Sequence, residues 1–136
     1  MIRSGYSDDC DGWELIMWRG AVASAIRGQR GQAFLREMLA ALDALPQKRL
    51  IADELQNNAG EVCAIGSVGR LRGVDMSKLD PEYPERIAET FGIASALVQE
   101  IEFINDEDFC WRGETTPERR FEIVRNWVVS QIKEAT

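Results

Sequence analysis

The stretch that decides the fold is residues 32–45, QAFLREMLAALDAL, the clearest helical segment of the chain. Its apolar side chains recur at spacings of three and four residues, which is the pattern of one buried face of an α-helix. They are Phe34, Leu35, Met38, Leu39, Leu42 and Leu45. Pro46 then ends the segment. A helix with such a face is stable only when other elements cover it, so its neighbours have to come from the rest of the chain.

Helical patterns on both sides of this segment predict those neighbours. Residues 13–27 are apolar on nearly every side, so we expect a central, well-covered helix there. Further on, prolines and helical spacing predict a short helix ending near Phe91. A turn at Gly92 and a second helix over residues 93–105 follow. The last helix is expected to begin at Thr115 or Thr116, either with a capping box that uses Glu118 or with an N-cap followed by Pro117.

The segment between residues 49 and 66 permits two interpretations. Two apolar runs flank a turn signal at residues 57–60, as in a short β-hairpin, but a helical turn over residues 50–56 fits the spacing equally well. Glycines then interrupt residues 66–74, and a glycine inside a helix costs about 1 kcal/mol relative to alanine. The expected fold is therefore mainly α: a compact bundle of five to six helices in a single domain, 1–136, with one short hairpin around 49–66 as an open option.

The composition argues against an enzyme. The chain of 136 residues contains no histidine, which removes Ser-His-Asp and Cys-His catalysis and zinc sites of the Cys/His kind. We therefore predict no catalytic residue, no metal site and no cofactor. The three cysteines are far apart and odd in number, as is typical of reduced thiols. No apolar run reaches the roughly 18 residues of a membrane span, and residues 1–9 lack a signal-peptide pattern, so a cytoplasmic location is expected.

The net charge of −7 comes from one half of the chain. Residues 1–72 carry nine basic and nine acidic side chains, whereas residues 73–136 carry seven and fourteen. An acidic surface repels a phosphate backbone and favours a basic protein surface. We therefore predict that this half binds a partner protein. The candidate partner-binding residues are Leu97, Glu100, Glu102, Asp106, Asp108 and Trp111.

Residues 84–103 have the spacing of a helix-turn-helix. Ala88, Gly92 and Val98 occupy the positions that need a small residue, a glycine and an apolar residue. However, the segment carries one basic and four acidic side chains, and its second helix offers no arginine or lysine to DNA. A helical hairpin without a nucleic-acid role is favoured, and a nucleic-acid-binding regulator is kept as the alternative function.

A second candidate site is the basic turn Arg27-Gly28-Gln29-Arg30-Gly31 between two expected helices. It is similar to the GxxG loop of KH domains, which clamps a nucleic-acid backbone, although the β-strand that precedes the KH helix pair is missing. Arg27, Gly28, Arg30 and Gly31 are therefore candidate anion-binding residues at a helix N-terminus. The competing interpretation is a tight turn with solvated arginines.

Three stretches carry a resemblance to a known group of proteins. They are residues 18–37, WRGAVASAIRGQRGQAFLRE, residues 44–52, ALPQKRLIA, and residues 116–121, TPERRF. The chain resembles a family of small uncharacterised proteins encoded by bacteriophages and prophages. The resemblance implies a phage or prophage context and supplies no catalytic or binding residues. By analogy with that class, the expected partner is a host or phage protein with a basic surface, such as a host regulatory or defence component.

Overall fold

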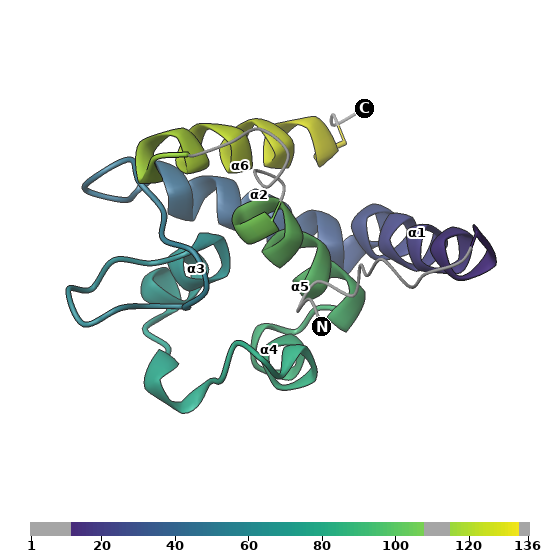
Figure 1. The fold of residues 1–136 in the computed structure, drawn as a ribbon, viewed down its shortest axis with the longest axis horizontal. Coiled ribbons are helices and arrows are strands. Elements are labelled where there is room, and N and C mark those ends of the chain that lie inside the picture. Colours follow the sequence, from purple (N-terminus) through teal and green to yellow (C-terminus); the bar gives the residue numbers. More distant parts are fainter. Residues whose placement is uncertain (1–11, 108–114, 134–136) are drawn as a thin grey trace.

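The computed structural model describes residues 12–107 and 115–133, which form a mainly α-helical bundle (Figure 1). These residues form six α-helices and two short helical turns, and none of them forms a β-strand. The α-helices are α1 (Gly12–Arg27), α2 (Gln29–Asp43), α3 (Ala64–Arg72), α4 (Pro84–Phe91), α5 (Ser95–Glu102) and α6 (Pro117–Gln131). The turns are the 3-10 turn η1 (Met76–Lys78) and the π-helical turn η2 (Phe103–Glu107). The prediction of a mainly α fold is confirmed.

Helix α2 is the centre of the packing, as its amphipathic pattern predicts. Leu35, Met38 and Leu42 are fully buried, and Phe34 is nearly so. The helix lies between α3 and α6, and Figure 1 shows α6 running along it. Burial of each such side chain stabilises the folded state by about 1.5–3 kcal/mol. The break between the two helices is shorter than the expected 28–31, because only Gly28 separates α1 from α2.

Helix α1 has the predicted bounds but not the predicted environment. Only Val22 and Ile26 of its large apolar side chains are buried, where the helix packs against α2 and α5. The first half extends past the other helices, as the purple end in Figure 1 shows, so Trp13, Ile16 and Met17 are exposed. The expectation of a central, well-covered helix is wrong, because no other described element reaches that end.

Helix α3 forms where glycines suggested an interruption. A Cβ atom at Gly66 would lie 2.0 Å from the carbonyl oxygen of Leu55. One at Gly69 would lie 2.7 Å from the sulfur of Met76. The two glycines therefore let neighbouring segments approach the helix closely, which offsets their low helix propensity. Cys63 caps the helix, since its sulfur accepts a hydrogen bond from the backbone N–H of Gly66 at 3.3 Å.

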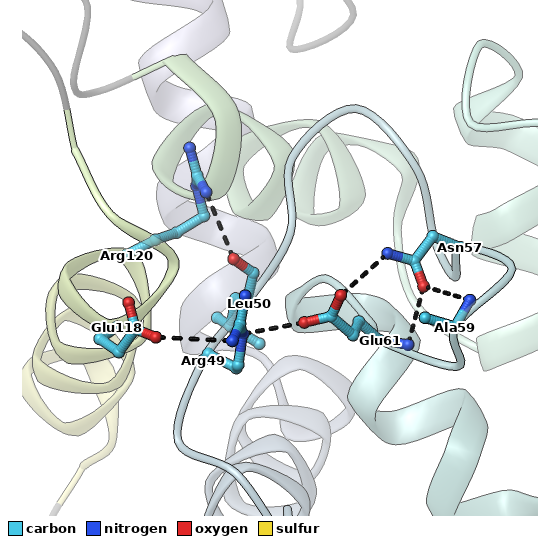
Figure 2. A network of polar contacts seen from close by, with 7 residues as sticks. All are labelled: Arg49, Leu50, Asn57, Ala59, Glu61, Glu118 and Arg120. Carbon is cyan, nitrogen blue, oxygen red and sulfur yellow. Dashed lines mark hydrogen bonds and ion pairs between the residues drawn. The ribbon is translucent and has the colours of Figure 1, made fainter.

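The segment between α2 and α3 forms neither a hairpin of strands nor a helical turn. Its only ladder pairing is the isolated antiparallel bridge between Gln56 and Val62. The side chain of Asn57 closes the turn by accepting hydrogen bonds from the backbone N–H groups of Ala59 at 3.0 Å and Glu61 at 2.9 Å (Figure 2). Local polar contacts thus replace a sheet in this part of the chain.

Two arginines attach the same segment to the start of α6 (Figure 2). Arg49 lies between Glu61, at 2.8 Å, and Glu118, at 3.7 Å. Arg120 donates to the carbonyl oxygens of Leu50 at 3.3 Å and Asn105 at 2.9 Å. Burial lowers the pKa of Arg120. These contacts join the loop, η2 and α6, which are distant in sequence.

The last three helices begin and end near the predicted positions. Helix α4 ends at Gly92, whose φ of 74° is the left-handed conformation that glycine adopts without strain. Three residues separate the last residue of α4, Phe91, from helix α5, which packs against α1, α3 and α4. Helix α6 starts as predicted: the hydroxyl of Thr116 accepts a hydrogen bond from the N–H of Arg119 at 3.0 Å, and Pro117 occupies the first turn.

Candidate interaction surface

Three of the predicted partner-binding residues are buried inside the bundle. Leu97 is 0% exposed, Glu100 is 3% exposed and Glu102 is 4% exposed. The prediction treated them as accessible to a partner, but α5 packs against α1, α3, α4 and η2. A partner cannot reach them without unfolding, so their assignment to an exposed binding face is corrected.

The two buried carboxylates, Glu100 and Glu102, lie among groups of the bundle itself. Glu100 accepts a hydrogen bond from Arg19 of α1 at 2.8 Å, so its charge is compensated across the interface between α1 and α5. Glu102 lines a very small pocket with Asn105 and Asp106. That pocket holds about 10 Å³, roughly the space of one water molecule. Neither group offers room for a substrate or an organic ligand.

Asp106 also has a structural contact. Its Oδ1 accepts hydrogen bonds from the side-chain amide of Asn105 at 2.5 Å and from the backbone N–H of Asp53 at 3.3 Å. Asn105 in turn accepts from the N–H of Ala64 at 3.1 Å. Together they hold η2 against the segment before α3. The predicted residues Asp108 and Trp111 lie outside the described residues.

An exposed acidic surface does exist in this half of the chain, from the N-cap residue of η1 to the end of α4. We call it the acidic surface and define it by five exposed carboxylates, Asp75, Asp80, Glu82, Glu85 and Glu89. Only two basic side chains, Lys78 and Arg86, lie within the same stretch. Helix α4 is held in place by the buried side chains of Ile87 and Phe91, so its outer face remains free to carry charge.

The carboxylates of the acidic surface differ from several other described carboxylates in that they form no salt bridge to a described residue. Across residues 12–107 and 115–133, no salt bridge involves any of the five. By contrast, Glu37, Asp43 and Glu61 are each paired with an arginine at 2.5–2.8 Å. Hydrogen bonds from Arg72 and Arg125 lower the pKa of Glu37 and Asp43, respectively. The acidic surface thus presents a net excess of negative charge, with five acidic and two basic side chains.

Local contacts order parts of the acidic surface without neutralising it. Asp75 caps η1 by accepting hydrogen bonds from the hydroxyl of Ser77 at 2.6 Å and from its N–H at 3.1 Å, and these bonds lower the pKa of Asp75. Asp80 accepts from the N–H of Glu82 at 2.9 Å. Tyr83, directly before α4, is 57% exposed. The surface therefore combines fixed negative charge with an accessible aromatic ring.

The predicted anion-binding turn is present, with different roles for its two glycines. Arg27 and Arg30 are exposed, and Gly28 caps α2 without a side-chain hydrogen bond. Gly31 is buried, and a Cβ there would lie 1.9 Å from the carbonyl oxygen of Ala25. Gly31 is therefore required for the close approach of α1 and α2, which supports the interpretation as a tight turn.

A hollow and further positive charge lie beside this turn. The hollow measures about 250 Å³ and is lined by Ser24, Ala25, Gly28, Gln29, Arg30, Gly31 and Ala94. Lys133 donates to the carbonyl oxygen of Arg27 at 2.9 Å, and Arg36 donates to that of Lys133 at 2.7 Å. We call Arg27, Arg30, Arg36 and Lys133 the basic corner.

The helix-turn-helix spacing of residues 84–103 describes a real helical hairpin, α4 and α5. Its second helix does not have the exposure of a recognition helix. Every residue from 93 to 106 is buried or half-buried. A helix that enters the major groove needs an exposed face with polar or basic side chains. The second helix of the hairpin, α5, is therefore part of the core of this bundle.

Comparisons with known proteins add no identification. No family model, no curated protein and no solved structure matches the chain.

Within the part of the chain that the structure describes, no cluster of three or more acidic or thiol ligands could hold a metal ion. None of the described helices has both the length and the apolar character needed to cross a bilayer.

The sequence indicated the half of the chain in which the candidate surface lies, but not the residues that form it. The available signal was the run of acids in residues 75–89, where Glu85 and Glu89 are four residues apart on one helix. Like charges at that spacing repel each other slightly on an isolated helix. That signal becomes informative only when the arginine partners of the other acids are known from the fold.

Proposed function

We propose that the chain is a non-enzymatic binding protein whose acidic C-terminal half docks onto a basic surface of a partner protein. The observation that supports this proposal is the acidic surface, with five exposed carboxylates that form no salt bridge to a described residue. The docking residues are thus Asp75, Asp80, Glu82, Glu85 and Glu89. They replace the buried set predicted from sequence.

Physical chemistry favours a basic partner for this surface. Glu85 and Glu89 repel each other in the free chain, and lysine or arginine side chains of a partner would turn that repulsion into attraction. Tyr83 adds an exposed ring of the type that anchors many protein interfaces. Charge of one sign also accelerates encounter with a partner of opposite sign, and salt screens the effect.

The absence of histidine from the whole sequence supports a role other than catalysis. The resemblance to small phage and prophage proteins suggests the setting: the cytoplasm of a bacterial host, with a host or phage protein as partner. An affinity capture of tagged protein from bacterial lysate, with and without nuclease, tests the proposal. A protein partner that remains after nuclease treatment is expected.

A charge-reversal pair shows whether the capture depends on the acidic surface. In the variant Glu85→Lys/Glu89→Lys, binding of the captured partner should be lost. The control Glu118→Lys/Glu122→Lys makes the same change in net charge on α6, where the acids already pair with Arg49 and Arg119. Equal capture by both variants would contradict the proposal.

Nucleic-acid binding is the alternative function, and the basic corner is the feature that favours it. Arg27 and Arg30 are exposed beside the N-terminus of α2, and Lys133 lies next to them. A gel shift at low salt with wild type and an Arg27→Ala/Arg30→Ala variant discriminates the two functions. A shift that the double variant abolishes would favour nucleic acid, and no shift at low salt would remove that alternative.

A further inference from the structure

The exposed face of α1 has no covering element among the described residues. Trp13, Ile16 and Met17 are 67%, 64% and 59% exposed. At 100° per residue they lie on one side of the helix, opposite Val22 and Ile26, which face the core. Large apolar side chains gathered on one face of a surface helix usually mark a site of interaction.

Gly20 lies on the same face and has no role inside the chain. A Cβ atom there would meet nothing within 4 Å. Glycine in a helix interior is unfavourable relative to alanine, so a structural reason is normally found in a close contact. For Gly31 and Gly66 such contacts exist within the chain, at 1.9 and 2.0 Å. Gly20 therefore leaves space for a close approach by another molecule.

The face is complementary to itself in an antiparallel arrangement. Gly20 lies seven residues, or about two helical turns, from both Trp13 and Arg27. When two copies of α1 cross antiparallel at Gly20, Trp13 of each reaches Arg27 of the other. There, the indole ring meets a cation and the hollow lined by Ser24 and Gly28. Within one copy, Trp13 is about 20 Å from that hollow along the helix axis and cannot fill it.

The surface available is sufficient for a weak dimer. With about 200 Å² for each fully exposed large side chain, Trp13, Ile16 and Met17 present about 380 Å² per copy. In two copies these side chains present about 760 Å², and Gly20, Ser24 and the hollow extend the contact toward the roughly 1,000 Å² that is the lower limit for a specific interface.

We infer that α1 pairs antiparallel with α1 of a second copy of this chain, around a two-fold axis near Gly20. Both partners use the same residues, as a two-fold interface requires. The projecting end of each α1 covers the base of the other helix. The acidic surface does not include any part of α1, so this inference stands independently of the proposed function.

Sedimentation equilibrium of the full chain from about 1 to 200 μM tests the inference, with dimer expected at the upper end. Ile16→Lys should raise the dissociation constant by on the order of 30-fold, because it places a charge in the centre of the interface. Leu71→Lys is the matched control, since Leu71 is an exposed apolar residue on α3, and it should leave the dimer unchanged. A monomer at all concentrations would overturn the inference.

Gly20→Leu separates an interface role from a folding role. Leucine improves helix propensity and has free space within the chain, so thermal stability of the monomer should rise while dimerisation falls. A loss of folding together with a loss of dimer would contradict the inference. The Glu85→Lys/Glu89→Lys variant should remain dimeric, which distinguishes failure of this inference from failure of the proposed function.

Cross-linking places the axis directly. In a Cys10→Ser/Cys110→Ser background, Gly20→Cys should form a disulfide-linked dimer on mild oxidation, because Gly20 of each copy faces Gly20 of the other. Cys63 is buried and should not interfere. Ala40→Cys, at an exposed position on α2, serves as the control and should stay uncross-linked. A dimer that forms without this cross-link, or that survives Ile16→Lys, would refute the α1 arrangement.

Discussion

Replacing Gly66 by alanine tests the close packing that explains a glycine inside α3. The new methyl carbon would lie 2.0 Å from the carbonyl oxygen of Leu55 and 3.0 Å from the Cβ of Val62. Because the nearest atom belongs to the backbone, the strain is relieved only if α3 moves away from the segment 55–62. Overpacking of this kind costs about 1–3 kcal/mol, and the gain in helix propensity returns about 1 kcal/mol. With so short a contact, we expect a net loss of about 2 kcal/mol.

Equilibrium urea unfolding followed by far-ultraviolet circular dichroism measures this loss as a lower midpoint at an unchanged slope. Gly20→Ala is the matched control: it is also a glycine within a helix, but its new methyl group meets nothing within 4 Å. It should stabilise the monomeric chain by about 0.5–1 kcal/mol. If Gly66→Ala were as stable as Gly20→Ala, the packing explanation for Gly66 would be refuted.

Two further predictions concern stability. Thr116→Ala removes the N-cap of α6 and should cost about 1 kcal/mol, measured by the same unfolding experiment, whereas Thr116→Ser should restore most of it. The ion pair between Arg72 and Glu37 should depend on pH. Since Arg72 lowers the pKa of Glu37 in the folded state, the pair stabilises the fold above the unfolded pKa and loses that effect as pH falls through the folded pKa. The difference in unfolding free energy between wild type and Arg72→Met should therefore shrink between pH 7 and about pH 3, and a constant difference would disagree with this assignment.

The parts of the fold that follow local rules were predictable from the sequence. The spacing of apolar residues predicted α2, Gly92 predicted the turn after α4, and Thr116 with Pro117 predicted the start of α6. Helix α3 was not predictable in the same way. Its glycines have low helix propensity, and the contact between Gly66 and Leu55 that makes glycine necessary appears only in the folded chain.

The candidate site was harder to predict because exposure depends on contacts between distant residues. From the sequence, Glu100 is expected at the surface. In the fold it is buried, and Arg19, 81 positions away in the sequence, compensates its charge. From the sequence, Trp13, Ile16 and Met17 are expected in the core. In the fold they are exposed, because this end of α1 extends beyond the described elements that could cover it. The count of charged residues therefore identified the acidic half of the chain. Only the fold distinguished its buried or paired carboxylates from those that are exposed and form no salt bridge to a described residue.

The central claim is that the acidic surface binds a basic partner, and the salt dependence of partner binding tests it most directly. The affinity of wild type for the captured partner should fall steadily as salt is raised from about 50 to 500 mM. The Glu118→Lys/Glu122→Lys control should behave like wild type, whereas Glu85→Lys/Glu89→Lys should bind weakly at every salt concentration. Binding that is insensitive to salt and equal in all three proteins would contradict the account.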